Sequence, residues 1–401
     1  MSNSKVFGST LIIAGTTIGA GMLALPIASA GLGFSTSLMI MVGMWALMAY
    51  TALLMLELHQ HADYDATLHT LAKQFLGEKG KWIATFAMLF LFYALCAAYI
   101  AGGGGQFNAK LYNWFSLDVS SGLGTVIFTL LIASIVTFGT HSVDRVNRVL
   151  FTCKLIAMAT MLFFLTPNIE AVNLVNMPLE KGLVVAALPV IFTSFGFHGS
   201  IPAVVRYLEL DMKALKKVML CGSLLPLIVY ILWQFATLGV VNQATLSQAS
   251  DVSSLVNILS QVIHNSMISQ IVSVFADLAL ITSFLGVSLG LFEFLGDSLN
   301  KRQTKKGRVA IAFVTFLPPL GFALFYPQGF IMALGYAAIA LAILAILLPV
   351  AMVVKSRQQH HETQAFTVSG GKPALIFTLL MGVVIIGVQL LISAGVLPAI
   401  G

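Results

Sequence analysis

Charged side chains are scarce in this sequence of 401 residues. Only 9% of the residues are Asp, Glu, Lys or Arg, whereas 58% are hydrophobic, and the mean hydropathy is +0.95. An ordinary globular domain contains roughly 25% charged residues, and so few charges cannot cover the surface of a soluble protein of this size. The composition therefore predicts a polytopic membrane protein and excludes most soluble enzymes and nucleic-acid-binding proteins.

Cysteines and metal-ligand patterns are also rare. Cys96, Cys153 and Cys221 all fall in apolar stretches, without a CxxC pair or a Cys/His spacing that would bind zinc. Three histidines, at positions 59, 61 and 69, share one polar segment, but their spacing favours solvated side chains over a metal site. We therefore predict no metal, no disulfide and no bound cofactor.

Motifs for nucleotide binding and hydrolysis are missing from the sequence. It contains no GxxxxGK[ST] loop for ATP phosphates and no HExxH motif for a zinc hydrolase. The glycine run at 102–105 lies at the end of an apolar stretch and is better explained as a helix end than as a nucleotide loop. Any transport by this chain must then use an ion gradient or the gradient of the substrate itself, and we expect no enzymatic activity.

Long apolar segments are present throughout the chain. A helix needs about 20 apolar residues to cross the hydrocarbon core, and eleven segments qualify, near 7–30, 34–56, 82–103, 122–140, 149–166, 183–204, 217–239, 271–296, 309–326, 329–353 and 374–396. The ten-residue alternation of a membrane barrel is not seen. The sequence predicts an all-α protein with about 11 transmembrane helices.

The basic residues predict the orientation of these helices. If the N-terminus is cytoplasmic, 18 of the 21 lysines and arginines fall in cytoplasmic segments or at their edges, as the positive-inside rule requires. An odd number of spans then places the C-terminus on the outer, periplasmic side. The longest outer loop, roughly 240–270, contains an amphipathic stretch at 255–263 that could be a solvated connector or a lid over an outer vestibule.

Two spans carry the same interruption. The first contains Gly15, Gly19 and Gly21 within seven residues, and the motif Thr16-Thr17-Ile18-Gly19 aligns with Thr193-Ser194-Phe195-Gly196 in the sixth span. Five spans separate the copies, so they cross the membrane in opposite directions, as in a 5+5 inverted repeat. We predict a single transporter domain over 1–401, with one repeat at about 6–166, a second at about 183–353 and an extra helix at about 374–396.

The glycines also allow a simpler interpretation. Gly15 and Gly19 form a GxxxG pattern, which serves close helix packing without any break. That reading does not account for hydroxyl residues before glycine in both copies. If the helices are broken, the freed N–H and C=O groups at mid-membrane need a polar ligand. Helix N-termini favour a carboxylate and C-termini favour an ammonium, so a zwitterionic amino acid fits both.

These segments resemble a known family. The run from Gly15 to Pro26, the run Phe192-Thr193-Ser194-Phe195-Gly196-Phe197-His198-Gly199-Ser200 and the stretch Phe275-Ala276-Asp277-Leu278-Ala279-Leu280 are similar to those of the hydroxy and aromatic amino acid permeases. The likeness covers nearly the whole chain. This family belongs to the amino acid–polyamine–organocation superfamily, whose fold is the 5+5 inverted repeat with broken helices 1 and 6.

The resemblance implies a function. It predicts a secondary transporter of the cell inner (cytoplasmic) membrane that imports an aromatic amino acid by proton symport and alternating access, and it favours L-tyrosine. The partners would be the amino acid, the proton and the lipid bilayer, without an ATPase subunit. The alternatives are a permease for tryptophan or another amino acid of the family, and a passive facilitator or channel.

The same resemblance implies a substrate site at the two breaks. The carboxylate would meet N–H groups at 19–21, the ammonium would meet carbonyls at 15, 16 and 193, and the ring would pack on aromatic residues with Tyr93 nearby. His198 is a candidate partner for a substrate hydroxyl or, alternatively, a structural histidine. The predicted substrate-binding residues are Gly15, Thr16, Thr17, Gly19, Ala20, Gly21, Met22, Thr193, Ser194, Phe195, Gly196, Phe197 and His198.

Two charges lie within the predicted spans, where each is costly enough to need a reason. Lys154, in the fifth span, either extends to the cytoplasmic surface or, as in some sodium-independent relatives of the superfamily, takes the place of a sodium ion beside the first and eighth helices. Asp277, in the eighth span, either carries the symported proton or is a structural carboxylate. We expect Lys154 or Asp277 to couple the proton, and we expect Glu57 to be interfacial.

Overall fold

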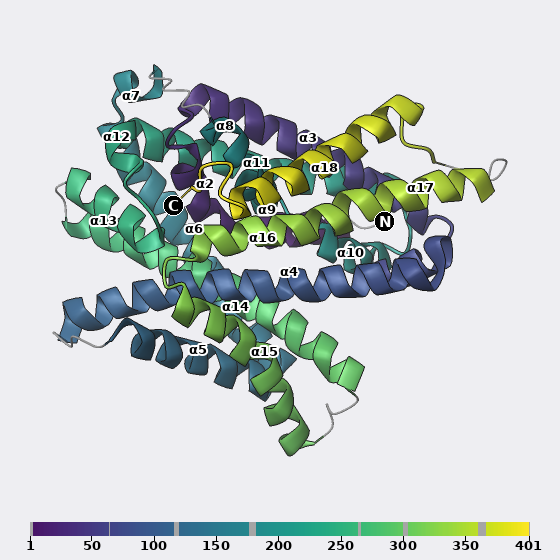
Figure 1. The fold of residues 1–401 in the computed structure, drawn as a ribbon, viewed down its shortest axis with the longest axis horizontal. Helices are drawn as coiled ribbons and strands as arrows, with labels where there is room; N and C mark the ends of the chain where they lie inside the picture. The colour runs from purple at the N-terminus through teal and green to yellow at the C-terminus, as the bar shows by residue number, and fades with distance from the viewer. Residues whose placement is uncertain are drawn as a thin grey trace.

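The chain folds into a bundle of helices, many of which run along its longest axis while others cross it obliquely (Figure 1). The computed structural model describes residues 3–63, 65–115, 120–175, 182–263, 266–299, 304–359 and 366–400, and these segments contain no β-strand. Each predicted span corresponds to one helix or one helix series. The prediction of an all-α polytopic membrane protein is confirmed.

The helices follow the apolar segments of the sequence closely. They are α1 (Asn3–Thr17) with α2 (Gly21–Ser29), α3 (Phe34–His59), α4 (Leu68–Phe115), α5 (Ser121–Phe138), α6 (Thr140–Leu165), the series α8 (Leu183–Ala186), α9 (Leu188–Ser194) and α10 (Ile201–Tyr207), α11 (Met212–Val240), α14 (Ser266–Leu299), α15 (Lys305–Phe325), α16 (Phe330–Ala342) with α17 (Leu348–Gln359), and α18 (Gly371–Ser393). Within the described segments, nine spans are long and apolar enough to cross a membrane, the bent pair α1 and α2 makes a tenth, and α5 is a shorter apolar helix.

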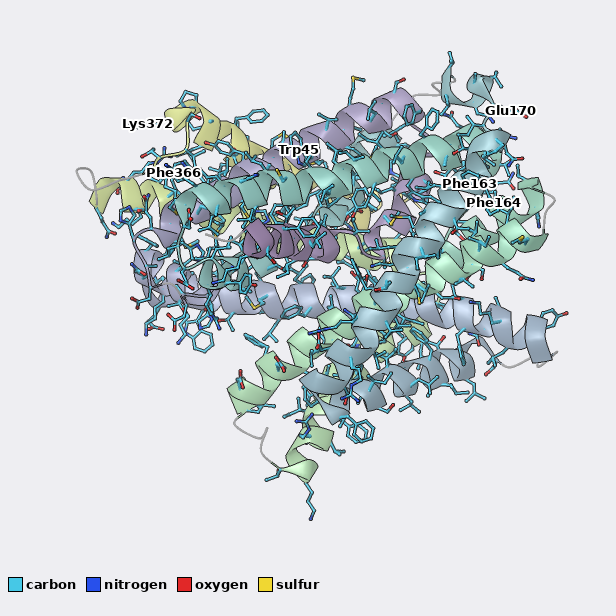
Figure 2. The ribbon with its side chains drawn as sticks, turned by 180° about the vertical axis from the view of Figure 1, so that it is seen from behind. Trp45, Phe163, Phe164, Glu170, Phe366 and Lys372 are labelled. Atoms are coloured by element: carbon cyan, nitrogen blue, oxygen red, sulfur yellow. The ribbon has the colours of Figure 1, made fainter. Side chains whose placement is uncertain are left out.

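The two ends of the chain lie at opposite ends of this bundle. The chain begins at the end where α17 finishes and terminates at the other end, beside α2 (Figure 1). Phe366 and Lys372, which precede and begin α18, lie at one end of the molecule, and Glu170 lies at the other (Figure 2). This arrangement agrees with an odd number of crossings.

Both interruptions predicted from the sequence are non-α-helical segments between two α-helices. The first separates α1 from α2 between Thr17 and Gly21, and the two axes differ by 52°. The second separates α9 from α10 and contains the 3-10 turn His198–Ser200. A third irregularity is a π-helical turn, Ile343–Leu347, between α16 and α17. The repeat boundaries themselves stay a prediction.

Two prolines inside helices free carbonyl groups that neighbouring helices satisfy. Pro26 has no N–H for the carbonyl four residues earlier, and the Trp233 indole donates to that oxygen, on Met22, at 2.9 Å. Pro318 likewise frees Val314, whose carbonyl accepts from the Tyr93 hydroxyl at 2.8 Å. Tyr93, expected beside the substrate ring, is therefore turned toward α15 instead.

Two groups of helices pack around the breaks. In the first group α1 packs on α11 and α11 packs on α3, while in the second α4 packs on α14, α15 and α16, and α6 packs on α14. Helix α17 contacts both α3 and α4. The second broken helix contacts both groups, because α9 packs on α3 and on α16. A change in the relative position of the two groups would therefore alter access to the interior.

The predicted amphipathic stretch of the long loop is a helix, α13 (Val252–Ile263), which follows the single turn α12 (Gln243–Leu246). Its apolar residues Val252, Leu255 and Leu259 are buried, and it packs on α14, α4, α11 and α2. It lies at the same end of the bundle as the C-terminus (Figure 1). A function as a lid stays a prediction.

A buried ion pair lies near the opposite end. Glu57 of α3 is 0% exposed, and its two carboxylate oxygens accept from the Nε and an Nη of Arg357 at 2.6 and 2.8 Å. One of them also accepts from the Val368 N–H at 2.8 Å. The segment before α18 covers Glu57, and its position at the membrane interface stays a prediction. His59, expected to be solvated, is buried as well, with Nδ1 on the Met55 carbonyl at 2.8 Å.

Candidate functional site

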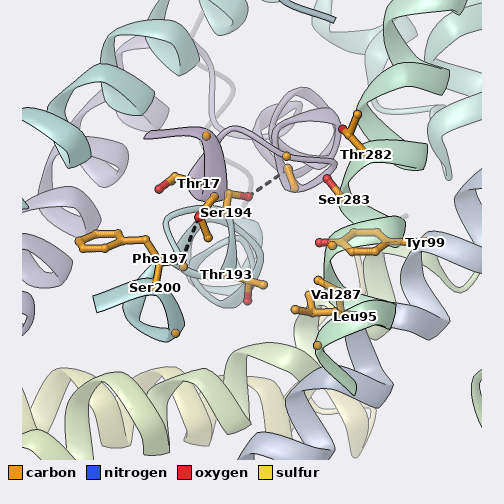
Figure 3. A pocket seen from close by; sticks show the side chains of 18 of the residues that line it. Thr17, Leu95, Tyr99, Thr193, Ser194, Phe197, Ser200, Thr282, Ser283 and Val287 are labelled. Carbon is orange, nitrogen blue, oxygen red and sulfur yellow. Dashed lines mark hydrogen bonds between the residues drawn. The ribbon is translucent and has the colours of Figure 1, made fainter. Parts of the chain in front are cut away.

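A cavity of about 640 Å³ lies between the two helix groups, at the level of the breaks. Its wall is formed by both broken helices and by α4, α6, α14 and α16. Besides residues at the breaks, the side chains on this wall include Leu95, Tyr99, Phe151, Lys154, Thr282, Ser283, Val287, Leu334 and Leu341. Figure 3 shows hydroxyl groups from three helices directed toward the same space. A cavity of this size, mostly apolar with a few polar groups, suits a small organic ligand.

Most of the predicted substrate-binding residues line this cavity. Those on its wall are Gly15, Thr16, Thr17, Gly19, Gly21, Thr193, Ser194, Gly196, Phe197 and His198. Three others are turned away from it: Ala20 donates its N–H to Ser283 Oγ at 2.9 Å, Met22 is fully buried, and Phe195 packs against Tyr230 with ring centroids 5.1 Å apart. Ala20, Met22 and Phe195 therefore do not line the cavity, and their contact with a substrate stays a prediction.

The N-terminus of α2 presents two backbone donors to the cavity. Within the described residues, no protein acceptor is in reach of the N–H groups of Gly19 or Gly21. A side chain would be crowded at both positions, because a Cβ at 19 would lie 2.8 Å from Ser283 Oγ and one at 21 would lie 3.2 Å from the Cα of Ser194. Free N–H groups at a helix N-terminus form a site for an anion.

The two breaks touch each other across the cavity. The hydroxyls of Thr16 and Ser200 are 2.9 Å apart, and Ser194 Oγ donates to the carbonyl of Gly21 at 3.0 Å. Simple GxxxG packing of continuous helices does not give such contacts. The helices are opened, and their exposed polar groups face one shared space.

Lys154 is buried beside the first break. It is 2% exposed, and its ammonium donates to the carbonyl of Ile18 at 2.9 Å and contacts Thr282 Oγ1 at 3.2 Å. The side chain therefore does not extend to the surface. It joins the first break to α14, and its nitrogen lies 4.6 Å from the centre of the Phe151 ring.

Asp277 lies outside the cavity wall. It forms an ion pair with Lys110 of α4, and both side chains are 18% exposed. This pair joins two helices of the same packing group. The structure therefore separates the two intramembrane charges named from the sequence: Lys154 contacts the broken helix, and Asp277 does not line the cavity.

His198 lines the cavity and is held by α3. Its Nε2 lies 2.8 Å from Thr51 Oγ1, and the Thr51 hydroxyl lies 3.1 Å from the Met48 carbonyl. If Thr51 donates to Met48, Nε2–H donates to Thr51 and Nδ1 is left as an acceptor; if Thr51 donates to Nε2, Nδ1 carries the hydrogen and is left as a donor. Nδ1 is buried and has no partner within the described residues. The histidine both fixes the second break and retains one hydrogen-bonding atom.

Tyr99 is a polar site residue that sequence reasoning missed. It lies on α4, lines the cavity, and its hydroxyl is directed from α4 toward the broken helices (Figure 3). Tyr93 and Tyr99 are six residues apart, which turns their side chains by about 240° around a helix of 3.6 residues per turn. The two tyrosines must therefore face different neighbours, and the helical period alone does not say which one faces the cavity.

One stretch of α14 matches a hydrolase motif without its structure. Gly286-Val287-Ser288-Leu289-Gly290 has the GxSxG pattern, whose serine is exposed on a sharp turn between a strand and a helix in hydrolases. Here Ser288 is buried inside a continuous helix and donates to the carbonyl of Phe284 at 2.5 Å. It is not placed to act as a nucleophile.

Comparison with known proteins places this chain in a family. Residues 2–389 match the model of the tryptophan/tyrosine permease family. The chain is 45% identical to tyrosine-specific transport system 1 of Haemophilus influenzae over 98% of this chain and 99% of that protein. It is 43% identical to tyrosine-specific transport system 2 of the same organism, with both chains covered completely. It is also 34% identical to the tryptophan-specific transport protein of that organism, over 96% of each chain. The family expected from the motifs of the broken helices is confirmed, and this chain is a member of the tryptophan/tyrosine permease family.

Proposed function

We propose that this protein imports L-tyrosine across the cytoplasmic membrane by proton symport. The observation that carries the proposal is the pair of broken helices whose free backbone groups meet at one cavity. The substrate is proposed from the relatives, because the two named for tyrosine transport are 45% and 43% identical to this chain and the one named for tryptophan is 34% identical.

The cavity offers separate groups to each part of an amino acid. The N–H groups of Gly19 and Gly21 would bind the carboxylate, and the carbonyls at the end of α1, on Gly15 and Thr16, would bind the ammonium. The ring would lie among Tyr99, Phe197 and other apolar side chains of the wall. The unpartnered Nδ1 of His198 is the hydrogen-bond partner that we assign to the phenol hydroxyl, which can donate or accept.

The proton would be carried by Lys154. In its charged form the ammonium holds the Ile18 carbonyl at the first break, and a neutral amine would hold it less strongly because charge-assisted hydrogen bonds are stronger. Loss of the proton would thereby loosen the link between α1 and α14. The protonation state of Lys154 would in this way affect the relative position of the two helix groups.

The proposed orientation makes this conformation open to the inside. The cavity reaches Leu11 and Ile12 of α1 and Arg148 of α6, residues near the end where the chain begins. The bias of the basic residues assigns that end to the cytoplasm. Alternating access would then require α1, α9 and their partners to rock against α4, α6 and α14 until the cavity closes inside and opens outside.

The proposal predicts that Asp277 is dispensable for coupling. An Asp277→Asn variant is expected to retain accumulation of tyrosine driven by a pH gradient, because the residue is paired with Lys110 away from the cavity. An Asp277→Asn/Lys110→Met double variant is the control for the unpaired lysine that the single change leaves. Loss of gradient-driven accumulation in both variants, with folding preserved, would assign the proton to Asp277 instead.

Uptake into proteoliposomes tests the function as a whole. Labelled tyrosine, tryptophan, phenylalanine and serine are offered to purified protein under an imposed proton gradient, an imposed sodium gradient, or neither. We expect tyrosine to accumulate above equilibrium with the proton gradient alone. Equilibration without accumulation would identify a passive facilitator or channel, accumulation with sodium alone would overturn the coupling, and a preference for tryptophan would overturn the substrate.

A further inference from the structure

The hydroxyl of Tyr230, on α11, contacts both broken helices at once. Its oxygen lies 2.6 Å from the carbonyl oxygen of Thr17 and 2.8 Å from that of Ser194. Thr17 is the last residue of α1 and Ser194 is the last residue of α9. Tyr230 therefore meets each break at the same point, which is the last carbonyl before the helix opens.

The two carbonyls are equivalent in the sequence as well as in the structure. Thr17 and Ser194 occupy the same position in the motifs that align between the first and sixth spans. Carbonyls at a helix end have no partner within the helix, and here a single side chain from outside both motifs supplies the donor. Since a hydroxyl has one proton, Tyr230 donates to one carbonyl at a time and the other stays available as an acceptor.

The contact is made at the cavity, unlike the other bonds from α11. Trp233 donates to Met22, which does not line the cavity, whereas Thr17 and Ser194 both do. Tyr230 itself is fully buried behind the breaks and lies outside the cavity wall. It can act on a ligand only through the two carbonyl-bearing ends that it holds.

We propose that Tyr230 is a positioning residue for the substrate site. Its hydroxyl keeps the ends of α1 and α9 at the separation at which the groups of both breaks reach the same amino acid. The inference rests on the proposed function, because it assumes that an amino acid occupies the cavity. It assigns part of the substrate affinity to a residue that does not touch the substrate.

The test compares two variants with the same chemical change. Tyr230→Phe removes the hydroxyl at the breaks, and Tyr93→Phe removes a hydroxyl that also bonds a helix carbonyl but lies outside the cavity. Dissociation constants for tyrosine and midpoints of thermal unfolding are measured on the purified full chain, and KM and Vmax are measured in proteoliposomes. We expect Tyr230→Phe to raise Kd and KM by about tenfold, and Tyr93→Phe to leave both near the wild-type values.

A variant that restores the donor completes the design. Replacement of Tyr230 by 4-aminophenylalanine supplies N–H groups at the same place and is expected to bring Kd to within about twofold of the wild type. Equal affinities in Tyr230→Phe, Tyr93→Phe and wild type would overturn the inference, as would a failure of the amino variant to recover affinity when it is folded. A wild-type protein that binds no tyrosine would instead overturn the proposed function.

Discussion

A Lys154→Gln variant is expected to lose accumulation of tyrosine driven by a proton gradient while it still exchanges labelled for unlabelled tyrosine. Glutamine retains a donor for the Ile18 carbonyl but takes up no proton at physiological pH. The cavity and the break are thus kept, and the charge is removed. Transport is measured in proteoliposomes with and without an imposed pH gradient, and exchange is measured at equal pH on both sides.

The control for this change is the same substitution at the surface. Lys213 at the start of α11 is exposed, and Lys213→Gln should accumulate tyrosine as the wild type does. If Lys154→Gln still concentrates tyrosine in response to the pH gradient, Lys154 does not carry the proton. Loss of exchange together with accumulation would show that the lysine is needed to keep the break intact, and not for coupling.

The largest effect on stability is expected from Arg357→Met. This change leaves the carboxylate of Glu57 buried without its cation. Removal of one partner from a buried ion pair lowers the free energy of unfolding by about 3–5 kcal/mol. The Val368 N–H would continue to donate to Glu57, but it adds no compensating charge. The midpoint of thermal unfolding of the purified protein should fall clearly below that of the wild type.

Two controls separate the buried charge from the lost packing of the arginine. In Glu57→Gln/Arg357→Met a neutral amide replaces the carboxylate and its oxygen can still accept from Val368, so most of the stability should return. In Lys73→Met the lost partner belongs to an exposed pair with Glu78, with side chains 55% and 59% exposed, and exposed pairs contribute at most about 1 kcal/mol. A double variant as unstable as Arg357→Met would show that packing, not charge, accounts for the loss.

The spans and breaks could be predicted from the sequence because their causes are local. Apolar length alone marks a membrane helix, and clustered glycines beside hydroxyl residues mark an opened one. The residues that complete the site are set by neighbours far along the chain. Tyr99 and Tyr93 have the same local features, and only the positions of α14 and α15 decide which of them meets the cavity.

Charge pairs were predicted least well, for the same reason. Glu57 and Arg357 are 300 residues apart, and nothing in either segment indicates the other. From the sequence, Asp277 is either a proton carrier or a structural carboxylate, because a carboxyl group buried in a membrane is easily protonated. Its partner Lys110 lies at the end of the third span, and nothing local to either residue indicates the pair. Lys154 was anticipated beside the broken first span through family resemblance, and its coupling function stays a prediction.

The prolines of this bundle have a meaning that a single helix does not reveal. Two proline–aromatic pairs link neighbouring helices: Pro26 with Trp233, and Pro318 with Tyr93. In each pair the proline leaves a carbonyl of its own helix without an N–H donor, and the aromatic residue of the other helix donates to that carbonyl. Alanine at either proline would return the oxygen to its own helix and take the acceptor from the aromatic donor, which is buried in the case of Trp233. Each proline therefore helps to link two helices, and its effect on stability depends on the aromatic partner as well as on the proline.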